Sequence, residues 1–445
     1  MPHPQLLRLL YGRLHDPPLD IMKPDDRELY VPLYESSSDL AMPEIDPVSR
    51  LLRQIQLSQE QSIQFFSGFR GAGKSTELLR LRRELGHQNY LVIYANALNY
   101  INETGVLDIS DLLILVAGAF SDGLKDRSIL GRDLKHQSFW DSLFNYLKRI
   151  KFSFGEISIS AGLELKASLK DSPSFRQKMQ SALSPHIATL KAEVDQYIEA
   201  SLREIRSYQP DATREVVFLF DSLEQIRGTV SLETDVQRSV ETVFGSHVDK
   251  LSLPGLHMIY TVPPWLRFLD TSRVPMVILP SIKQWNRDGS AYEPGNEALR
   301  QILVKRLGTE GVEQLLGGDI RRADPLIKSC GGHVRDLLHL LRQVLLAVKQ
   351  LPASEQVIAR AVEQVRWEYS AGLAIDDAAW LERIARTRAA DRHLGDIGRL
   401  SRFLDTHTVL YFVDDREWYD VHPLVREEAK KMLERNQAAE RSQDV

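Results

Sequence analysis

A chain of 445 residues is too long for one compact core, because single cores stop growing at about 250–300 residues, so we expect two or three domains. Apolar residues make up 43% of the chain and charged residues 26%, which excludes a mostly disordered protein. The 56 basic and 61 acidic side chains give a formal net charge of −5, which argues against a dedicated nucleic-acid coat or a polybasic membrane binder.

The single cysteine, Cys330, excludes an internal disulfide framework and a zinc site built from several cysteines. The longest apolar run, from 112 to 120, is about half of the roughly 18 residues that a membrane span needs. The first residues lack the apolar stretch of a signal peptide, because Arg8 interrupts it. We therefore expect a soluble, cytoplasmic protein without a membrane partner.

Residues 1–45 form an expected N-terminal preface, which several prolines divide into turns. Asp46-Pro47 then predicts the start of a helix, because aspartate is a good N-cap and proline fits the first helical position. From there to about residue 285, continuous apolar segments alternate with helical patterns, which is typical of a parallel sheet covered on both faces. The predicted strands are 63–67, 90–95, 216–220, 256–262 and 274–279.

An insertion at about 150–210 interrupts this alternation between the second and third predicted strands. Apolar and polar residues alternate there around Gly155 and Gly162, which predicts a β-hairpin, and a long helix over about 176–207 follows. The apolar positions of the predicted hairpin are Phe152, Phe154, Ile157, Ile159, Leu163 and Leu165.

Beyond the predicted sheet domain, 46–285, the pattern is helical. We expect a helical lid over 286–352, a winged-helix-like domain over 353–437 and a flexible tail over 438–445. The winged helix is indicated by short helices followed by two alternating segments, 409–413 and 418–422, with a polar turn between them.

The segment Gly68 to Ser75 matches the phosphate-loop pattern G-x-x-x-x-G-K-[ST] in full, and it lies between a predicted strand and a predicted helix. Glycines let successive backbone N–H groups point at phosphates, and the following helix adds its positive end. Lys74 would bridge the β- and γ-phosphates, Ser75 would bind magnesium and Thr76 would lie near the α-phosphate. The predicted nucleotide-binding residues of the loop are Gly68, Arg70, Gly71, Ala72, Gly73, Lys74, Ser75 and Thr76. For Arg70 a phosphate contact and a solvated loop position stay open.

Asp221 follows the third apolar strand and is the predicted carboxylate partner of magnesium. Many AAA+ enzymes place a glutamate directly after this aspartate, but Ser222 stands there. Glu224 is the nearest acid. Either it orients the attacking water as a general base, or it is a surface residue that caps the next helix. A displaced base predicts slow hydrolysis.

Two further positions are candidate sensors of the γ-phosphate. Thr261 lies at the tip of the fourth strand, or it is a strand residue that only bonds backbone. Arg335 follows two glycines at a helix start, where a cation is unfavourable, so it calls for an anion, either the nucleotide or the adjacent Asp336. His333 alone needs no function. Arg227, Arg267 and Arg273 are equal candidates for an arginine acting on a second copy.

The segments GFRGAGKST, VVFLFD with Glu224, Thr261, GGHVRDLL and YDVHPLVREEA together resemble the STAND and origin-recognition branches of AAA+-related P-loop ATPases. The resemblance covers about residues 45–435. It implies an α/β fold, with a P-loop NTPase parallel sheet, a helical lid and a C-terminal winged-helix domain. It also implies an ATP/ADP switch with Mg2+ that oligomerises when ATP is bound, and bacterial relatives act in signalling and anti-phage defence. No repeat sensor or effector domain is recognisable, so a separate effector partner is expected.

Three functions compete. The first is a regulatory, slowly hydrolysing ATPase switch. The second is a DNA-binding ATPase of initiator or transposition-helper type, which arginines before the predicted hairpin favour. Acidic residues in the same region and in the hairpin turn, such as Asp414, Asp415 and Glu417, oppose it, so DNA is possible but not favoured. The third is a small-molecule kinase, for which no acceptor motif is found. The arginines in question are Arg383, Arg386, Arg388, Arg392, Arg399 and Arg402.

Overall fold

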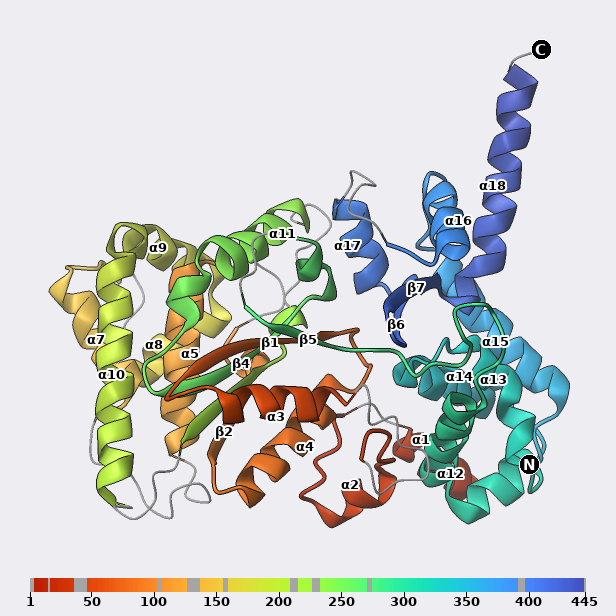
Figure 1. Ribbon diagram of the computed structural model, residues 1–445, viewed down its shortest axis with the longest axis horizontal. Helices are drawn as coiled ribbons and strands as arrows, with labels where there is room; N and C mark the ends of the chain where they lie inside the picture. The colour runs from red at the N-terminus through yellow and green to blue at the C-terminus, as the bar shows by residue number, and fades with distance from the viewer. Residues whose placement is uncertain are drawn as a thin grey trace. The chain divides into compact units, whose positions relative to one another are not determined.

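The computed structural model describes residues 4–14, 17–35, 46–101, 106–125, 137–154, 159–208, 215–225, 233–269, 274–390 and 397–443 (Figure 1). By its contacts the chain divides into two units, and each is described by itself. The sheet unit consists of Val48–Ser67 and Arg80–Ile278. The loop unit consists of Met1–Pro47, Gly68–Leu79 and Leu279–Val445, so it contains the phosphate-loop motif. This division differs from the expected boundaries, which placed that motif with the sheet.

A five-stranded sheet with the order β2-β3-β4-β1-β5 forms the centre of the sheet unit. The pairs β1–β4, β2–β3 and β3–β4 are parallel, which confirms the expected α/β fold class. All five predicted strands are present, with ends that differ by one or two residues. They are β1 Ser62–Gly68, β2 Leu91–Asn96, β3 Val216–Asp221, β4 Leu256–Val262 and β5 Met276–Leu279.

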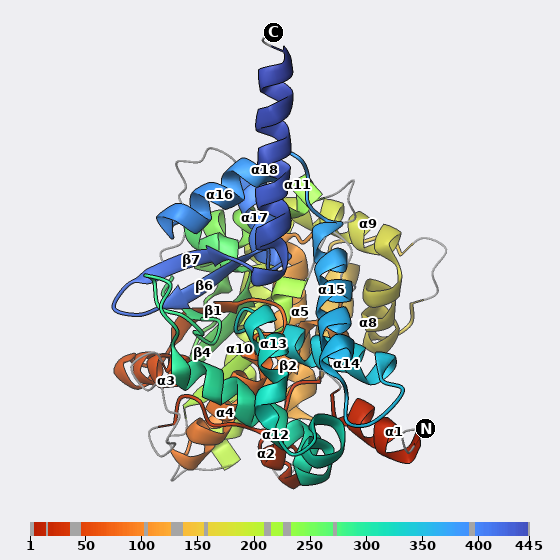
Figure 2. The same ribbon diagram turned by 90° about the vertical axis from the view of Figure 1, so that its right-hand side faces the viewer.

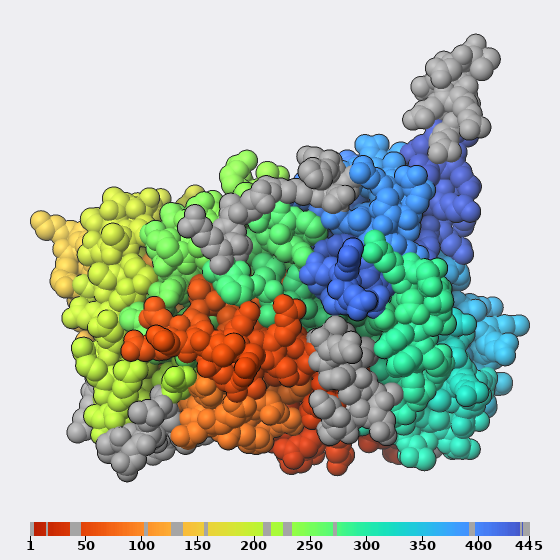
Figure 3. Space-filling view, in the orientation of Figure 1, coloured from red at the N-terminus to blue at the C-terminus, as the bar shows by residue number. Residues whose placement is uncertain are grey.

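Every residue of β3 and β4 is buried, as expected for central parallel strands with both faces covered. Helix α5 (Ile109–Leu124) begins with a capping box between Asp108 and Asp111 and packs against β2. Helix α10 (Ile187–Tyr208) packs on α5 and forms an outer wall of the unit, yellow-green in Figure 3. The other helices are α3 Pro47–Leu57, α4 Lys74–His87, which begins in the loop unit, α7 Phe139–Arg149 and α11 Glu233–Glu241.

The predicted hairpin of the insertion is wrong in its second arm, because residues Gly162–Asp171 form helix α8. Leu165 and Leu169 are buried one turn apart, whereas Leu163 is 76% exposed, so the helical period applies and the strand period does not. Glycine at 162 allows close packing, since a Cβ atom there would lie 2.4 Å from the backbone of Trp140, and its N–H donates to Asp141 at 3.1 Å. Ile157 and Gly155 lie outside the described residues.

The long helix expected over 176–207 is likewise divided. Helix α9 (Pro173–Leu183) and α10 are separated by a 3-10 turn, Ser184–His186. Proline at position 185 removes one backbone donor and crowds the preceding turn, which explains the break.

In the loop unit the N-terminal segment packs on helices from the expected lid. Lys305 donates to the Tyr30 carbonyl at 2.6 Å, and Arg342 donates to the Leu14 carbonyl at 3.0 Å. The preface is therefore part of the same contact unit as the lid helices. The helices are α1 Pro4–Arg13, α2 Pro24–Leu29, α12 Glu293–Leu316, α13 Asp324–Ser329, α14 Val334–Ala347 and α15 Glu355–Ser370.

The C-terminal elements come in the predicted order, two helices, an antiparallel hairpin and a last helix, and Figure 2 shows α18 rising from the hairpin. Trp418 in the hairpin is buried and stacks on Phe412 at 4.5 Å between ring centroids. These elements are α16 Asp377–Thr387, α17 Ile397–Asp405, β6 Val409–Val413, β7 Glu417–Val421 and α18 Pro423–Gln443. None of the helices within the described ranges is long and apolar enough to cross a bilayer.

Candidate phosphate-binding site

The phosphate loop, residues 69–73, joins the end of β1 to the start of α4 and has no regular secondary structure. Gly71 and Gly73 have φ angles of 89° and 103°, a region that residues with a Cβ atom rarely adopt. A Cβ atom on Gly73 would have no atom within 4 Å, so open space adjoins this part of the loop. The backbone thus requires the glycines of the motif and leaves room beside them.

Lys74 is only 3% exposed, and its Nζ atom donates to the carbonyls of Gly68 and Phe69 at 3.0 Å each. The two carbonyls belong to the last residue of β1 and the first residue of the loop, so the ammonium group is held on the inside of the loop. A cation in this place fits a phosphate bound beside the loop.

The first turn of α4 is hydrogen-bonded to the N-terminal segment. The hydroxyl of Thr76 accepts a hydrogen bond from the Leu19 N–H at 3.1 Å, and Tyr30 donates to Glu77 at 3.3 Å. The predicted place of Thr76 near an α-phosphate stays a prediction, and so does the magnesium role of the half-buried Ser75.

Arg335 packs directly on the phosphate loop. A Cβ atom built on Gly71 would lie 2.7 Å from both Cβ and Nε of Arg335, so only glycine fits there. The arginine is brought to the loop by a sharp turn between α13 and α14, in which Gly331 and Gly332 have positive φ angles. The structure therefore places this predicted sensor beside the motif, while its contact with a nucleotide stays a prediction.

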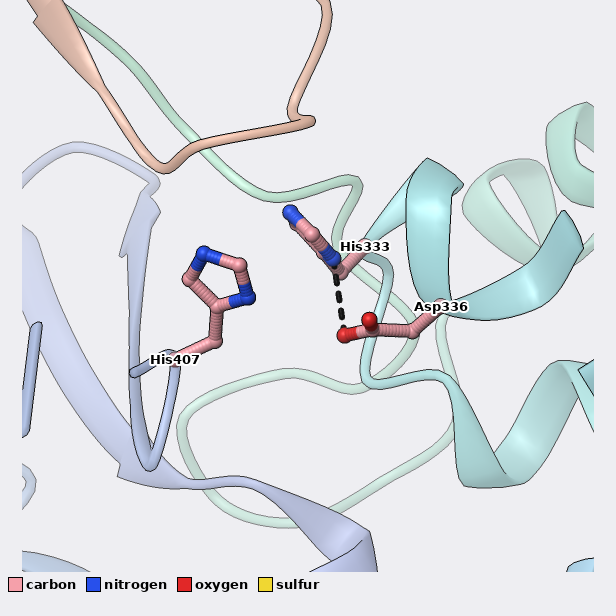
Figure 4. Close-up of side chains that lie close together, drawn as sticks. All are labelled: His333, Asp336 and His407. Carbon is pink, nitrogen blue, oxygen red and sulfur yellow. Dashed lines mark ion pairs between the residues drawn. The ribbon is translucent and has the colours of Figure 1, made fainter. Parts of the chain in front are cut away.

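A cluster of buried histidines around Asp336 adjoins the loop, and it was not expected from the sequence. His333 Nε2 lies 2.9 Å from the Arg70 carbonyl oxygen, and His333 Nδ1 pairs with Asp336 at 2.7 Å. Figure 4 shows His333, Asp336 and His407 turned toward one another; the two imidazole centroids are 4.2 Å apart. The His407 ring also meets Phe69 of the loop, edge to face, at 5.7 Å.

Charge inside this cluster is concentrated on Asp336. Burial opposes its ionisation, but His333 and His422 outweigh that effect and hold its pKa well below the usual range. Burial and the nearby Asp336 raise the pKa of Tyr369 well above its usual range. Burial also raises the pKa of the Cys330 thiol to about 12, so this cysteine is packed and unreactive, as its sequence context suggested.

In the sheet unit, three predicted site residues gather at the carboxyl ends of β3 and β4. Asp221 is fully buried; its carboxylate accepts from the Tyr94 hydroxyl at 2.6 Å and from the Ser222 N–H at 2.7 Å. Thr261 accepts from the Leu223 N–H at 3.1 Å, which links the tip of β4 to the turn after Asp221.

Glu224 lies in the 3-10 turn Leu223–Gln225 and is 9% exposed, so the alternative of a surface residue does not hold. Its role as a base stays a prediction. Of the candidate trans-acting arginines, Arg267 lies over the Phe268 ring at 5.9 Å, while Arg227 and Arg273 fall outside the described residues.

Sequence reasoning missed Tyr94 and His407 as partners in these sites, and it named Asp336 only as an alternative partner of Arg335. GGHVRD marked the place of Asp336, but no local pattern pairs it with His407, which lies 71 positions further along the chain. Tyr94 follows the ordinary apolar pattern of a strand and gives no separate signal.

No known family model matches the chain, and no curated protein matches it either. Among solved structures it is similar to the ORC2 protein of Aeropyrum pernix, with 13% identity, a TM-score of 0.37 and coverage of 93% of this chain and 98% of that one. It is also similar to a Walker-type ATPase of Pyrococcus abyssi, with 13% identity, a TM-score of 0.37 and coverage of 89% of this chain and 99% of that one. Cdc6p of Pyrobaculum aerophilum has 10% identity and a TM-score of 0.34, with coverage of 92% of this chain and 98% of that one. Identities and TM-scores this low transfer no function to this chain.

Proposed function

We propose that the chain binds ATP and ADP at the loop Gly68 to Thr76 and acts as a nucleotide-dependent switch. The observation that carries this proposal is the loop itself: glycines in left-handed conformations, a buried Lys74 held on its inner carbonyls and Arg335 packed on Gly71. Cations and backbone N–H groups around open space suit the charge and size of a phosphate chain.

The loop and Arg335 would bind the nucleotide phosphates. Lys74 leaves the loop carbonyls for the β- and γ-phosphates, the loop N–H groups bind phosphate oxygens, and Arg335 responds to the γ-phosphate. Ser75 and Asp221 are the proposed magnesium ligands, on the strength of the sequence pattern. Mg2+ would neutralise phosphate charge there.

Hydrolysis is proposed to be slow. Ser222 has a positive φ of 71° directly after Asp221, and Glu224 lies beyond it in a separate turn. The base is thus not the immediate neighbour of the magnesium ligand, as it is in fast AAA+ enzymes. A slow ATPase holds each nucleotide state for a long time, which suits a switch.

Three separate segments of the loop unit contact the loop and its helix: Leu19 from the N-terminus, Arg335 from α14 and His407 from the turn before β6. A change of nucleotide at the loop therefore alters contacts to all three. We propose that this change is read out as self-association and as binding of a separate effector protein, in bacterial signalling or anti-phage defence.

Isothermal titration calorimetry with Mg–ATP and with ADP tests the proposal. Lys74→Ala should weaken binding at least about tenfold, because it removes the phosphate-facing cation. Lys250→Ala is a matched control, since this lysine pairs with the neighbouring, exposed Asp249. The absence of binding to the unaltered chain, or equal binding by Lys74→Ala, contradicts the proposal.

The DNA-binding alternative loses support from the arginines that suggested it. Arg388 pairs with Asp420, Arg402 pairs with Asp377 at 2.6 Å, and Arg399 donates to the Asp376 carbonyl at 3.0 Å. Arg388 and Arg402 thus neutralise buried acids of their own region and add little to an open basic surface, whereas Arg383 and Arg386 are exposed. Arg392 lies outside the described residues.

A further inference from the structure

Two buried side chains next to the phosphate loop have polar atoms that no hydrogen bond satisfies. His333 is fully buried and Asp336 is 5% exposed. His333 Nδ1 and Asp336 Oδ2 lie 2.7 Å apart, yet neither atom has a hydrogen-bond partner within the part of the chain that is described. Buried polar atoms without a partner cost free energy, so native proteins rarely leave two of them side by side.

The other ring nitrogen of His333 shows which of its atoms can bind a metal. Nε2 is hydrogen-bonded to the Arg70 carbonyl oxygen at 2.9 Å. A carbonyl oxygen only accepts, so Nε2 carries the hydrogen, and the lone pair of the neutral ring is on Nδ1. Histidines that bind metals almost always donate their other ring N–H to a carbonyl or a carboxylate. His333 has this arrangement, and its Nδ1 is turned toward Asp336 (Figure 4).

A third side chain comes from a distant segment of the loop unit. His407, in the turn before β6, is buried, and its ring centroid lies 4.2 Å from that of His333. One ligand atom from each of His333, Asp336 and His407 lies within 4.8 Å of the other two. His422 is not part of this group. Its Nδ1 accepts from the Leu424 N–H at 3.2 Å, and its Nε2 lies 3.3 Å from Asp336 Oδ2.

We propose that His333, Asp336 and His407 bind one divalent transition-metal ion, for which zinc is the best fit. Two imidazoles and a carboxylate are ligands that zinc accepts in proteins, whereas magnesium and calcium prefer oxygen alone. Ligand atoms 2.0–2.1 Å from one zinc ion are about 2.9 Å apart at a right angle and about 3.3 Å apart at the tetrahedral angle. A small rotation of the Asp336 carboxylate therefore brings the present 2.7 Å into this range.

A metal-free histidine–aspartate pair is the competing interpretation. Asp336 lies in the first turn of α14, where a negative charge is favourable, and 2.7 Å is also the length of a charged hydrogen bond. Such a pair would, however, join His333 Nδ1 and Asp336 Oδ2 by a hydrogen bond, and neither atom takes part in one among the described residues. The metal site also accounts for the approach of His407 to both of them.

The ion would join three segments of the loop unit. These are the start of α14, the turn before β6 and, through the hydrogen bond of His333 to the Arg70 carbonyl, the phosphate loop. A ligand that binds only the folded chain stabilises it, because binding shifts the unfolding equilibrium by mass action. Zinc should therefore raise the midpoint of thermal unfolding. This site is distinct from the proposed magnesium ligands Ser75 and Asp221.

Zinc binding by the full chain, without nucleotide, tests the proposal. The chain is treated with a chelator and titrated with Zn2+ in the presence of Mg2+, and Co2+ serves as a spectroscopic probe. We expect one zinc ion per chain, and at least about tenfold weaker binding in Asp336→Asn and His407→Asn, since each lacks one ligand. Asparagine tolerates the left-handed backbone of residue 407, whose φ is 58°. His87→Gln, at the exposed end of α4, is the matched control and should bind like the unaltered chain.

Two results of the titration overturn the proposal: no zinc bound by the unaltered chain, or equal affinity in all four chains, which would mean surface binding only. An unfolding midpoint that zinc does not raise also contradicts it. If Asp336→Asn and His407→Asn do not fold, X-ray absorption at the zinc edge of the unaltered chain decides. Two imidazoles among the ligands are expected, and fewer than two overturn the proposal. Because no nucleotide is present, none of these results depends on the proposed function.

Discussion

Asp221 is a single residue whose carboxylate is fixed on both oxygens. The Tyr94 hydroxyl donates to Oδ2 at 2.6 Å, and the Ser222 N–H donates to Oδ1 at 2.7 Å. Hydrogen bonds to an ionised acceptor are short and strong, so Tyr94 sets the direction in which the remaining lone pairs point. If Asp221 binds magnesium as proposed, Tyr94 would tune the affinity for the metal without touching it.

Tyr94→Phe should therefore raise the Mg2+ concentration needed for half-maximal ATP hydrolysis by about tenfold. Nucleotide binding without magnesium should stay unchanged, because the phosphate loop is not altered. The measurement is a magnesium titration of phosphate release. Tyr90→Phe, directly before the same strand, is the control, and equal magnesium dependence in both variants contradicts the role of Tyr94.

Asp111 is a buried acid whose ionisation costs stability. Its Oδ2 atom accepts from the Asp108 N–H and from Gln180, while Oδ1 has no hydrogen-bond partner within the part of the chain that is described. Burial is the main cause that raises its pKa to about 6. The folded state thus favours the protonated form, and stability falls as pH rises from about 4 to about 6.

Asp111→Asn should stabilise the chain by about 1–3 kcal/mol at pH 7.5, because an amide keeps the acceptor at Oδ2 without a buried charge. The gain should shrink at pH 4.5, where the folded aspartate is already protonated. Urea unfolding at both pH values measures it, with the exposed Asp249→Asn as control. A loss of stability at pH 7.5 would show that the carboxylate is needed ionised.

At the scale of elements, strands were predicted well because each is a continuous apolar run between turn signals. Ile63 to Ser67 and Leu256 to Val262 leave no helical alternative of reasonable length. The insertion was predicted badly, because Leu163 and Leu165 fit a period of two as well as Leu165 and Leu169 fit a period near four. Packing of α8 on α7, where Gly162 lies against Trp140 and Asp141, decides between these periods, and such tertiary contacts are not visible in a local window.

In the candidate site, too, local motifs were predicted and contacts between distant segments were not. Lys74 and its glycines form a contiguous motif, so the sequence predicts their geometry. His407 and His333 meet through the fold of the loop unit, and His333 Nε2 lies 2.9 Å from the Arg70 carbonyl oxygen. Contacts between distant segments have no local signature.

The turn between α13 and α14 is the element that carries Arg335 to the loop, and Gly332 makes it possible. Gly332 has a φ of 76°, its carbonyl accepts from the Ile282 N–H at 3.0 Å, and a Cβ atom there would lie 1.8 Å from the Ile282 oxygen. Any side chain would push the backbone of residue 282 away.

Gly332→Ala should destabilise the chain by about 2–5 kcal/mol, since it combines left-handed strain with a backbone clash. Gly86→Ala, inside α4 with no atom within 4 Å of the added methyl, should instead gain about 0.5–1 kcal/mol. Urea midpoints of the two variants provide the comparison. Equal midpoints would mean that the backbone at residue 282 moves aside without loss of stability.

For the whole molecule, the net charge and the ion pairs within the chain help to decide whether the partner is DNA or a protein. The chain carries −5 overall, and arginines around the terminal hairpin pair with acids of the same region. Asp414 in the hairpin turn pairs with Lys283 and accepts from Trp418 at 3.0 Å. A wing that tracks DNA phosphates is normally basic, so these features favour a protein partner.

Self-association that depends on the bound nucleotide would be a property of the whole molecule. The γ-phosphate distinguishes ATP from ADP, and the loop that would bind it contacts Arg335, the N-terminal segment and His407. We expect the mass in solution to match one chain with ADP and to increase with Mg2+ and a non-hydrolysable ATP analogue, as measured by light scattering after size exclusion.

Arg335→Ala should bind the analogue and stay a single chain, whereas Lys74→Ala should not bind it. Loss of assembly with retained binding would identify Arg335 as the link between nucleotide and association. The same mass with both nucleotides contradicts the switch while leaving nucleotide binding intact.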